Sequence, residues 1–199
     1  MATILTAPTD DFVNMWIGTF NQRMVGELHS PDGNIEYICQ KLGVPLDNDR
    51  IKRASKLRFD FGISTMIPRA DAITTVSSLK TMDYKTCLVS NCSSEAPVIW
   101  NTTEFAPLFD ATVFSCLEKV MKPDLRIYEL ALTRLDMRAK DCLYVGDGGN
   151  KELSGASQAG MHPVLLKIPP GDGDAYQVDM DPWDGPAISS LSEVLELVR

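Results

Sequence analysis

The stretch that decides the fold is "CLYVGDGGNKELSGASQAGM", residues 142–161. Its apolar beginning ends abruptly in Gly146-Asp147-Gly148-Gly149, and a segment rich in small residues and typical of a helix follows. The pattern predicts a buried strand that ends in a carboxylate and turns directly into a helix. In open α/β sheets, ligands bind beyond the carboxyl ends of the strands. We therefore expect the carboxylate to act with polar groups from neighbouring strands.

The chain around this stretch alternates between short apolar strands and helices from Pro68 onward. The alternation predicts a Rossmann-like α/β fold, with a parallel sheet and helices on both of its faces. The expected strands are "KTCLVSN" at 85–91, "ATVFS" at 111–115, "CLYVGD" at 142–147 and "HPVLLKI" at 162–168.

The first third of the chain has a different character. Residues 10–67 show helical spacing of apolar side chains and no strand pattern, and Asp10 or Asp11 is expected to cap the first helix. The sequence thus predicts two parts, a small α-helical region at 1–67 and an α/β core at 68–199.

Composition excludes several classes of function. The formal net charge is -8, which disfavours binding to nucleic acids and to anionic membrane surfaces. The five cysteines are odd in number and form no C-x-x-C pair, so neither a disulfide framework nor a zinc site is expected. No signal peptide or run of membrane-spanning length is recognised, and a cytoplasmic location is expected.

Three polar residues occupy equivalent places after strands: Ser90, Lys122 and Asp147. A hydroxyl and an ammonium group bind phosphate oxygens, and a carboxylate suits Mg²⁺, which prefers oxygen ligands. Each residue alone has a structural explanation, as a cap, a solvated loop charge and a turn residue respectively. Their combination and order favour a site for a phosphoryl group and a divalent cation.

The ordered set resembles the haloacid dehalogenase superfamily, in particular its phosphatase-like members with an early helical cap. The segments that carry the resemblance are "LVSN" at 88–91, "MKPDLRIYELAL" at 121–132 and "YVGDGGNKEL" at 144–153. The resemblance implies that Ser90 and Lys122 are catalytic residues that hold the phosphate, and that Asp147 and Glu152 bind the metal. It also implies that the helical residues 10–67 form the cap.

The implied activity is a Mg²⁺-dependent phosphomonoesterase that acts on a small phosphorylated metabolite. Asn91, which follows Ser90, is expected either to contact the substrate or to serve as a turn amide. Two other functions remain open. One is a non-catalytic pseudoenzyme or short form that binds a protein partner or a phosphorylated ligand. The other is a 2-haloacid dehalogenase, which would not need the metal-binding acidic cluster.

The first motif of the family is missing, because it requires an apolar strand that ends in D-x-D. Its aspartates would supply the nucleophile and the general acid/base. None of the D-x-D sequences of the chain follows an apolar strand, and all are expected to be caps or turns: Asp47-Asn48-Asp49, Asp172-Gly173-Asp174 and Asp179-Met180-Asp181. We therefore expect a truncated chain that is inactive or impaired.

The resemblance implies that the missing strand lies in the middle of the sheet, between "CLVS" and "CLYV". Unpaired buried backbone groups cost roughly 1–3 kcal/mol each, so such a gap is unfavourable. We expect the sheet to close up, to recruit another strand such as "ATILTA" at 2–7, or to borrow one from another chain in a homodimer.

Overall fold

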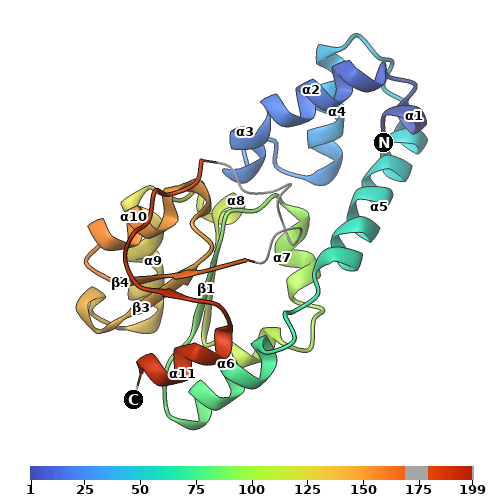
Figure 1. Ribbon diagram of the computed structural model, residues 1–199. Helices are drawn as coiled ribbons and strands as arrows, with labels where there is room; N and C mark the ends of the chain where they lie inside the picture. Colours follow the sequence, from blue (N-terminus) through green and yellow to red (C-terminus); the bar gives the residue numbers. More distant parts are fainter. Residues whose placement is uncertain (169–178, 199) are drawn as a thin grey trace. The chain divides into compact units, whose positions relative to one another are not determined.

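The computed structural model describes residues 1–168 and 179–198, which form two compact units (Figure 1). Unit 1 consists of Met1–Ile67, Asn91–Ala106 and Phe114–Lys119. Unit 2 consists of Pro68–Ser90, Pro107–Val113 and Val120–Arg199. Residue 67 ends the first segment of unit 1, and two later segments also belong to this unit. The assignment of residues 1–67 as a cap stays a prediction.

Unit 1 is helical, as the sequence predicts for residues 10–67. Its helices are α1 (Ala2–Leu5), α2 (Thr9–Gly18), α3 (Phe20–Met24), α4 (Pro31–Lys41), α5 (Asn48–Thr65), α7 (Glu95–Trp100) and α8 (Ser115–Glu118). Side-chain caps begin the two longest helices: Ser30 accepts from Gly33 N in α4, and Asp47 accepts from backbone N–H groups in α5. Apolar side chains from α1, α2, α4 and α5 share one buried cluster.

Two expectations for the beginning of the chain are wrong. The "ATILTA" segment is not a strand that fills the sheet, because Ala2–Leu5 is a helix. Ala2 and Leu5 are both buried in the unit 1 core, and a helix brings residues at this spacing onto one face. Asp10 and Asp11 do not cap α2, whose N-cap is Pro8. They lie in its first turn, where negative charge is favourable near the positive end of the helix dipole.

Unit 2 contains the remaining helices and the strands, apart from Phe114 at the end of the second strand. The strands are β1 (Cys87–Ser90), β2 (Ala111–Phe114), β3 (Leu143–Gly146), β4 (His162–Leu166) and β5 (Ala187–Ile188). The α-helices are α6 (Ala72–Thr81), α9 (Leu125–Leu135), α10 (Glu152–Gln158) and α11 (Val194–Leu197). Short 3₁₀ turns are η1 (Ala106–Leu108), η2 (Ala139–Asp141), η3 (Gly149–Lys151) and η4 (Leu191–Glu193). All four predicted strands are confirmed, and the two-residue β5 is additional.

Alternating side chains of β3 enter two different cores. Tyr144 packs with side chains of α9 and α10, whereas Leu143 and Val145 pack in a cluster that includes side chains of α6 and α11. Strand β4 pairs in parallel with both β3 and β5. The prediction of a parallel sheet with helices on both faces is therefore confirmed, and α11 lies beside α6 in Figure 1.

The strands of unit 2 form two separate sheets. One contains β1 and β2, and the other has the order β3-β4-β5. Within the described residues no strand joins β1 to β3, which are the strands that the sequence places on either side of the gap. The sheet has therefore neither closed up nor recruited a strand from the described residues.

The described part of the chain has no helix that is both long and apolar enough to cross a membrane. Its longest α-helix, α5, has 18 residues and carries charged side chains such as Lys52 and Arg53.

The thiol of Cys87 in β1 makes the stability of the protein depend on pH. Burial raises its pKa from 9.0 to about 11, against the opposing effect of Arg134. Because the pKa is higher in the folded state, its contribution is complete below pH 9 and is lost as the pH rises to about 11. We expect the free energy of unfolding of the wild type to fall by about 2–3 kcal/mol more than that of Cys87→Ala over this range. Urea unfolding of both proteins at several pH values measures this difference. The same dependence of the free energy of unfolding on pH in the wild type and in Cys87→Ala would contradict the prediction.

Candidate functional site

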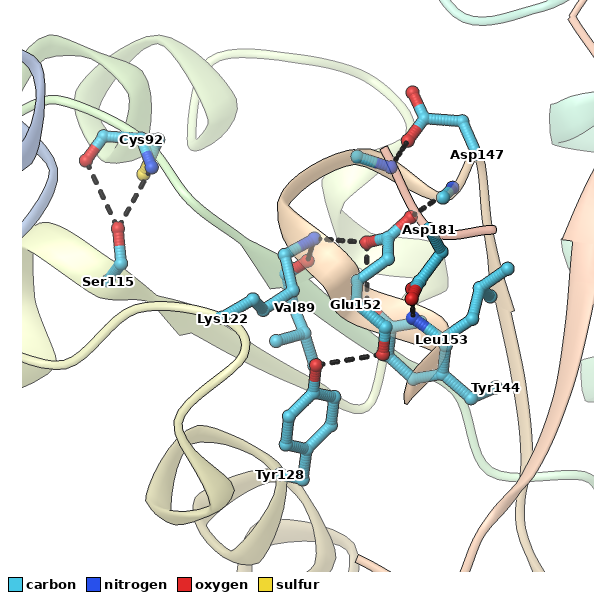
Figure 2. Close-up of polar contacts among 12 residues, drawn as sticks. Val89, Cys92, Ser115, Lys122, Tyr128, Tyr144, Asp147, Glu152, Leu153 and Asp181 are labelled. Atoms are coloured by element: carbon cyan, nitrogen blue, oxygen red, sulfur yellow. Dashed lines mark hydrogen bonds and ion pairs between the residues drawn. The ribbon is translucent and has the colours of Figure 1, made fainter. Parts of the chain in front are cut away.

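A buried ion pair lies at the centre of the candidate site. Lys122 Nζ and Glu152 Oε2 are 2.6 Å apart, and their side chains are only 11% and 5% exposed. Lys122 belongs to the loop before α9, and Glu152 is the first residue of α10. Figure 2 shows the two side chains pointing toward each other. Two charges removed from water need further partners to compensate for their lost hydration.

Neutral hydrogen-bond donors and one acceptor provide further partners for Glu152 and Lys122. Glu152 Oε2 also accepts a hydrogen bond from the Tyr144 hydroxyl at 2.8 Å, and Oε1 accepts one from Gly148 N at 3.1 Å (Figure 2). Lys122 Nζ donates to the carbonyl oxygen of Val89 at 3.3 Å. The contacts tie the end of β1, the side of β3 and the loop after β3 to one ion pair. They also occupy both oxygens of the Glu152 carboxylate.

Glycine at the end of β3 makes room for the carboxylate. A Cβ atom at Gly146 would lie 2.1 Å from Glu152 Oε1 and 2.5 Å from Glu152 Cδ. The hydroxyl of Tyr128 donates to the backbone carbonyl of Glu152 at 2.9 Å and so fixes the start of α10. Burial, followed by the charge of Glu152, raises the pKa of Tyr144 well above its ordinary value, so this phenol remains a hydrogen-bond donor at neutral pH.

Asp147 lies in the loop between β3 and α10. Its Oδ1 accepts a hydrogen bond from Gly149 N at 3.0 Å, which is a turn contact of the expected kind. Gly148 has a φ of 89°, and this left-handed conformation suits glycine. The carboxylate of Asp147 is of the ligand type that Mg²⁺ prefers. Among the described residues, no group of three or more acidic, histidine or cysteine side chains forms a metal site.

Ser90 and Asn91 lie where β1 ends. Ser90 is the last residue of β1 and directly follows Val89, whose carbonyl accepts from Lys122. Asn91 is the next residue and begins the second segment of unit 1. The structure thus brings Lys122 and Glu152 into contact at the end of β1, and it links the Asp147 loop to them through Gly148.

Asp47 is a helix cap, as predicted, and Asp181 of the loop sequence Asp179-Met180-Asp181 contacts the start of a distant helix, which was not predicted. Asp47 caps α5 through the backbone N–H groups of Asp49 and Arg50. Asp181 accepts from Leu153 N at 2.9 Å and from Ser154 N at 3.0 Å, and therefore caps α10. The sequence Asp172-Gly173-Asp174 lies outside the described residues.

Sequence reasoning missed the part that Tyr144 plays in the site. Tyr144 is 9% exposed and binds Glu152, whereas its apolar neighbours in "CLYV" suggest an ordinary core residue. A buried tyrosine usually finds a partner for its hydroxyl, and this was the available signal. The contact of Asp181 with α10 spans 27 or 28 residues and has no local signal.

Comparison with known proteins identifies the family of the chain. Residues 5–160 match the family model of haloacid dehalogenase-like hydrolases. A glyceraldehyde 3-phosphate phosphatase from Methanothermobacter thermautotrophicus is 26% identical over 135 residues, which cover 66% of this chain and 58% of the relative. An (S)-2-haloacid dehalogenase from Pseudomonas putida is 27% identical over 148 residues, covering 73% of this chain and 62% of the relative. The chain thus spans less than two thirds of the length of these curated relatives.

The fold is also similar to that of solved structures. The crystal structure of a 2-haloacid dehalogenase from Pseudomonas syringae pv. Tomato DC3000 superimposes with a TM-score of 0.69 at 16% identity. The alignment covers 99% of this chain and 84% of that one. The family match extends over most of the chain and includes the segments that carry Ser90, Lys122 and Asp147. The chain therefore belongs to the haloacid dehalogenase-like hydrolases.

Proposed function

We infer that the site of this chain binds the phosphoryl group of a small phosphorylated metabolite together with Mg²⁺, as in a phosphomonoesterase. The observation that carries this proposal is the Lys122 ammonium group, which is buried and donates to the carbonyl of Val89, the residue before Ser90. Glu152 fixes this ammonium group in position in a site shielded from water, and N–H donors of an ammonium group suit phosphoryl oxygens. The name of the phosphatase relative supports a small phosphorylated metabolite as the ligand class.

The proposed roles follow from the chemistry of each side chain. Lys122 and Ser90 bind phosphoryl oxygens, and Asn91 contacts the substrate. Asp147 is the direct ligand of Mg²⁺, and Glu152 is its acidic companion, which acts by holding Lys122 and the loop at Gly148. When bound, Mg²⁺ neutralises charge that develops on the phosphoryl oxygens.

We also propose that turnover by this chain is low. Aspartyl-phosphate chemistry requires a carboxylate nucleophile. In the D-x-D sequences with a described placement, Asp47 and Asp181 are engaged as helix caps and Asp179 pairs with Lys151, which supports the proposed lack of a nucleophile. Hydrolysis of p-nitrophenyl phosphate with Mg²⁺ tests this directly. We expect the wild type and Asp147→Asn to release product at nearly the same low rate. Robust wild-type activity that is lost in Asp147→Asn would overturn the proposed inactivity and would assign Asp147 to the reaction.

A non-catalytic role is the second candidate, and the separation of β1 from β3 favours it. An open sheet edge pairs readily with a strand of another chain. On this proposal the chain forms a homodimer, or binds a protein partner, through the gap. Sedimentation equilibrium measures the oligomeric state. A monomer at all concentrations would contradict the homodimer.

A dehalogenase function is the third candidate, supported by the name of the Pseudomonas putida relative. The two chemistries differ in their need for a metal. Chloride release from 2-chloropropionate in the presence of a chelator would favour the dehalogenase. Phosphate binding that requires Mg²⁺ would favour the phosphatase-like site.

A further inference from the structure

Two cysteines of unit 1 lie next to each other although 24 positions separate them in the chain. The Sγ atoms of Cys92 and Cys116 are 3.9 Å apart, and the residues are 8% and 7% exposed. Both thiols are reduced. Cys92 follows β1 by two residues, and Cys116 is the second residue of α8. The other three cysteines, Cys39, Cys87 and Cys142, lie in α4, in β1 and just before β3.

Contacts of Ser115 and Gly26 hold the backbone segments of Cys92 and Cys116 close to each other. The Ser115 hydroxyl accepts a hydrogen bond from Cys92 N at 2.9 Å (Figure 2), and it donates to the carbonyl of Met24 at 2.6 Å. It therefore joins the segment of Cys92 to the residue before Cys116. Gly26 packs so closely that a Cβ atom there would lie 2.1 Å from the carbonyl oxygen of Cys116. With both backbones fixed, the two thiols remain near each other, which favours an intramolecular reaction.

The distance between the sulfur atoms is suitable for a covalent bond after a small movement. A disulfide has an S–S length of about 2.05 Å, so the atoms must approach by about 1.9 Å from their separation of 3.9 Å. Rotation about the Cα–Cβ bonds moves sulfur atoms over distances of this order while the backbone hydrogen bonds of Ser115 stay in place.

The environment favours the thiolate form of Cys116. The hydrogen bond from Cys92 lowers the pKa of Cys116 below its ordinary value of 9.0, although burial opposes this effect. A thiolate reacts with oxidants, whereas a thiol does not. The pKa values of Cys39, Cys87 and Cys142 are instead raised, with burial as the largest cause.

We propose that Cys92 and Cys116 form a redox-sensitive site that a peroxide converts into an intramolecular disulfide. The Cys116 thiolate attacks one peroxide oxygen and breaks the O–O bond, which gives a sulfenic acid and releases water after protonation. The Cys92 thiol then attacks the sulfur of the sulfenic acid, the S–S bond forms, and the hydroxyl leaves as water with the Cys92 proton. In total two thiols lose two electrons and two protons, and hydrogen peroxide becomes two molecules of water.

The disulfide would restrain chain segments on both sides of β2. It joins Cys92, two residues after Ser90, to Cys116, six residues before Lys122. The closed loop contains α7, η1 and β2. This inference rests on the two thiols and on the Ser115 contacts, and it does not depend on the proposed phosphate site.

Titration of the reduced, folded protein with stoichiometric hydrogen peroxide tests the proposal. After quenching and alkylation under denaturing conditions, we expect the alkylated cysteines to fall from five to three. Peptide mapping by mass spectrometry should identify a Cys92–Cys116 cross-link, and dithiothreitol should restore all five thiols. Persistence of five alkylated cysteines, or a cross-link between other cysteines, would overturn the proposal.

Matched variants test the specificity of the cross-link. Cys142→Ala should retain the cross-link, whereas Cys92→Ala and Cys116→Ala should abolish it. Peroxide should raise the melting temperature of the wild type and of Cys142→Ala only, because a disulfide restrains the unfolded chain. An equal rise in Cys92→Ala would contradict the assignment. The wild-type peptide map stands alone as a test if either variant fails to fold.

Discussion

Replacing Lys122 by methionine is expected to lower the free energy of unfolding by about 3–5 kcal/mol, because it leaves the buried Glu152 carboxylate without its cation. Lys122 Nζ lies 2.6 Å from Glu152 Oε2, and the Glu152 side chain is 5% exposed. The remaining donors to Glu152, the Tyr144 hydroxyl and Gly148 N, carry no full charge. Urea unfolding followed by circular dichroism measures the change.

Lys151→Met is the matched control for this prediction. Lys151 also forms an ion pair in unit 2, with Asp179 at 3.3 Å, but these side chains are 51% and 57% exposed. Exposed pairs contribute roughly 0–1 kcal/mol, so this variant should unfold almost as the wild type does. Removing one partner of a buried ion pair is strongly destabilising. A decrease in the free energy of unfolding below about 1 kcal/mol in Lys122→Met would therefore contradict the prediction that Lys122 and Glu152 compensate each other's charge.

Replacing Gly146 by alanine is expected to disrupt the Lys122–Glu152 ion pair by displacing Glu152. The new methyl group would lie 2.1 Å from Glu152 Oε1, so the carboxylate must move. Movement lengthens the contact with Lys122 and the hydrogen bond from Gly148 N. Overpacking of this kind costs about 1–3 kcal/mol, and the displaced Lys122 should also bind phosphate more weakly. Chemical denaturation and phosphate titration of the same preparation measure both effects.

Gly18→Ala is the control for Gly146→Ala. Gly18 is the last residue of α2, and no atom lies within 4 Å of a Cβ atom placed there. Alanine is favoured over glycine in helices by roughly 0.5–1 kcal/mol, so this variant should be unchanged or slightly more stable. Equal destabilisation of the two variants would show that the contact with Glu152 is not the cause.

The fold could be predicted because its signals are local. An apolar run predicts the strand that ends at Gly146. The turn residues and small residues after it predict the helix that follows. The short β5 was missed because two residues, Ala187 and Ile188, are too few to show alternation. The helix at Ala2–Leu5 was missed for a related reason, since four residues satisfy a strand pattern as well as a helical one.

The candidate site could be predicted only in part. Ser90, Lys122, Asp147 and Glu152 follow strands or begin helices, so the parallel topology alone suggested that they approach one sheet edge. The contacts of Glu152 with Tyr144 and of Cys92 with Cys116 join residues from different elements. Their pairing depends on side-chain packing across elements, which spacing along the chain does not encode.

Phosphate binding tests the central claim most directly. Inorganic phosphate titrated into the wild type with Mg²⁺ in an isothermal calorimeter should give saturable binding to one site. Ser90→Ala should bind about 10-fold more weakly or worse, because a hydrogen bond to a charged group contributes about 1.5–3 kcal/mol. Ser78→Ala removes a hydroxyl that donates to the carbonyl of Thr74 within α6, and this variant should bind phosphate as the wild type does. Absence of binding by the wild type, or equal affinity in Ser90→Ala, would contradict a phosphate site at the end of β1.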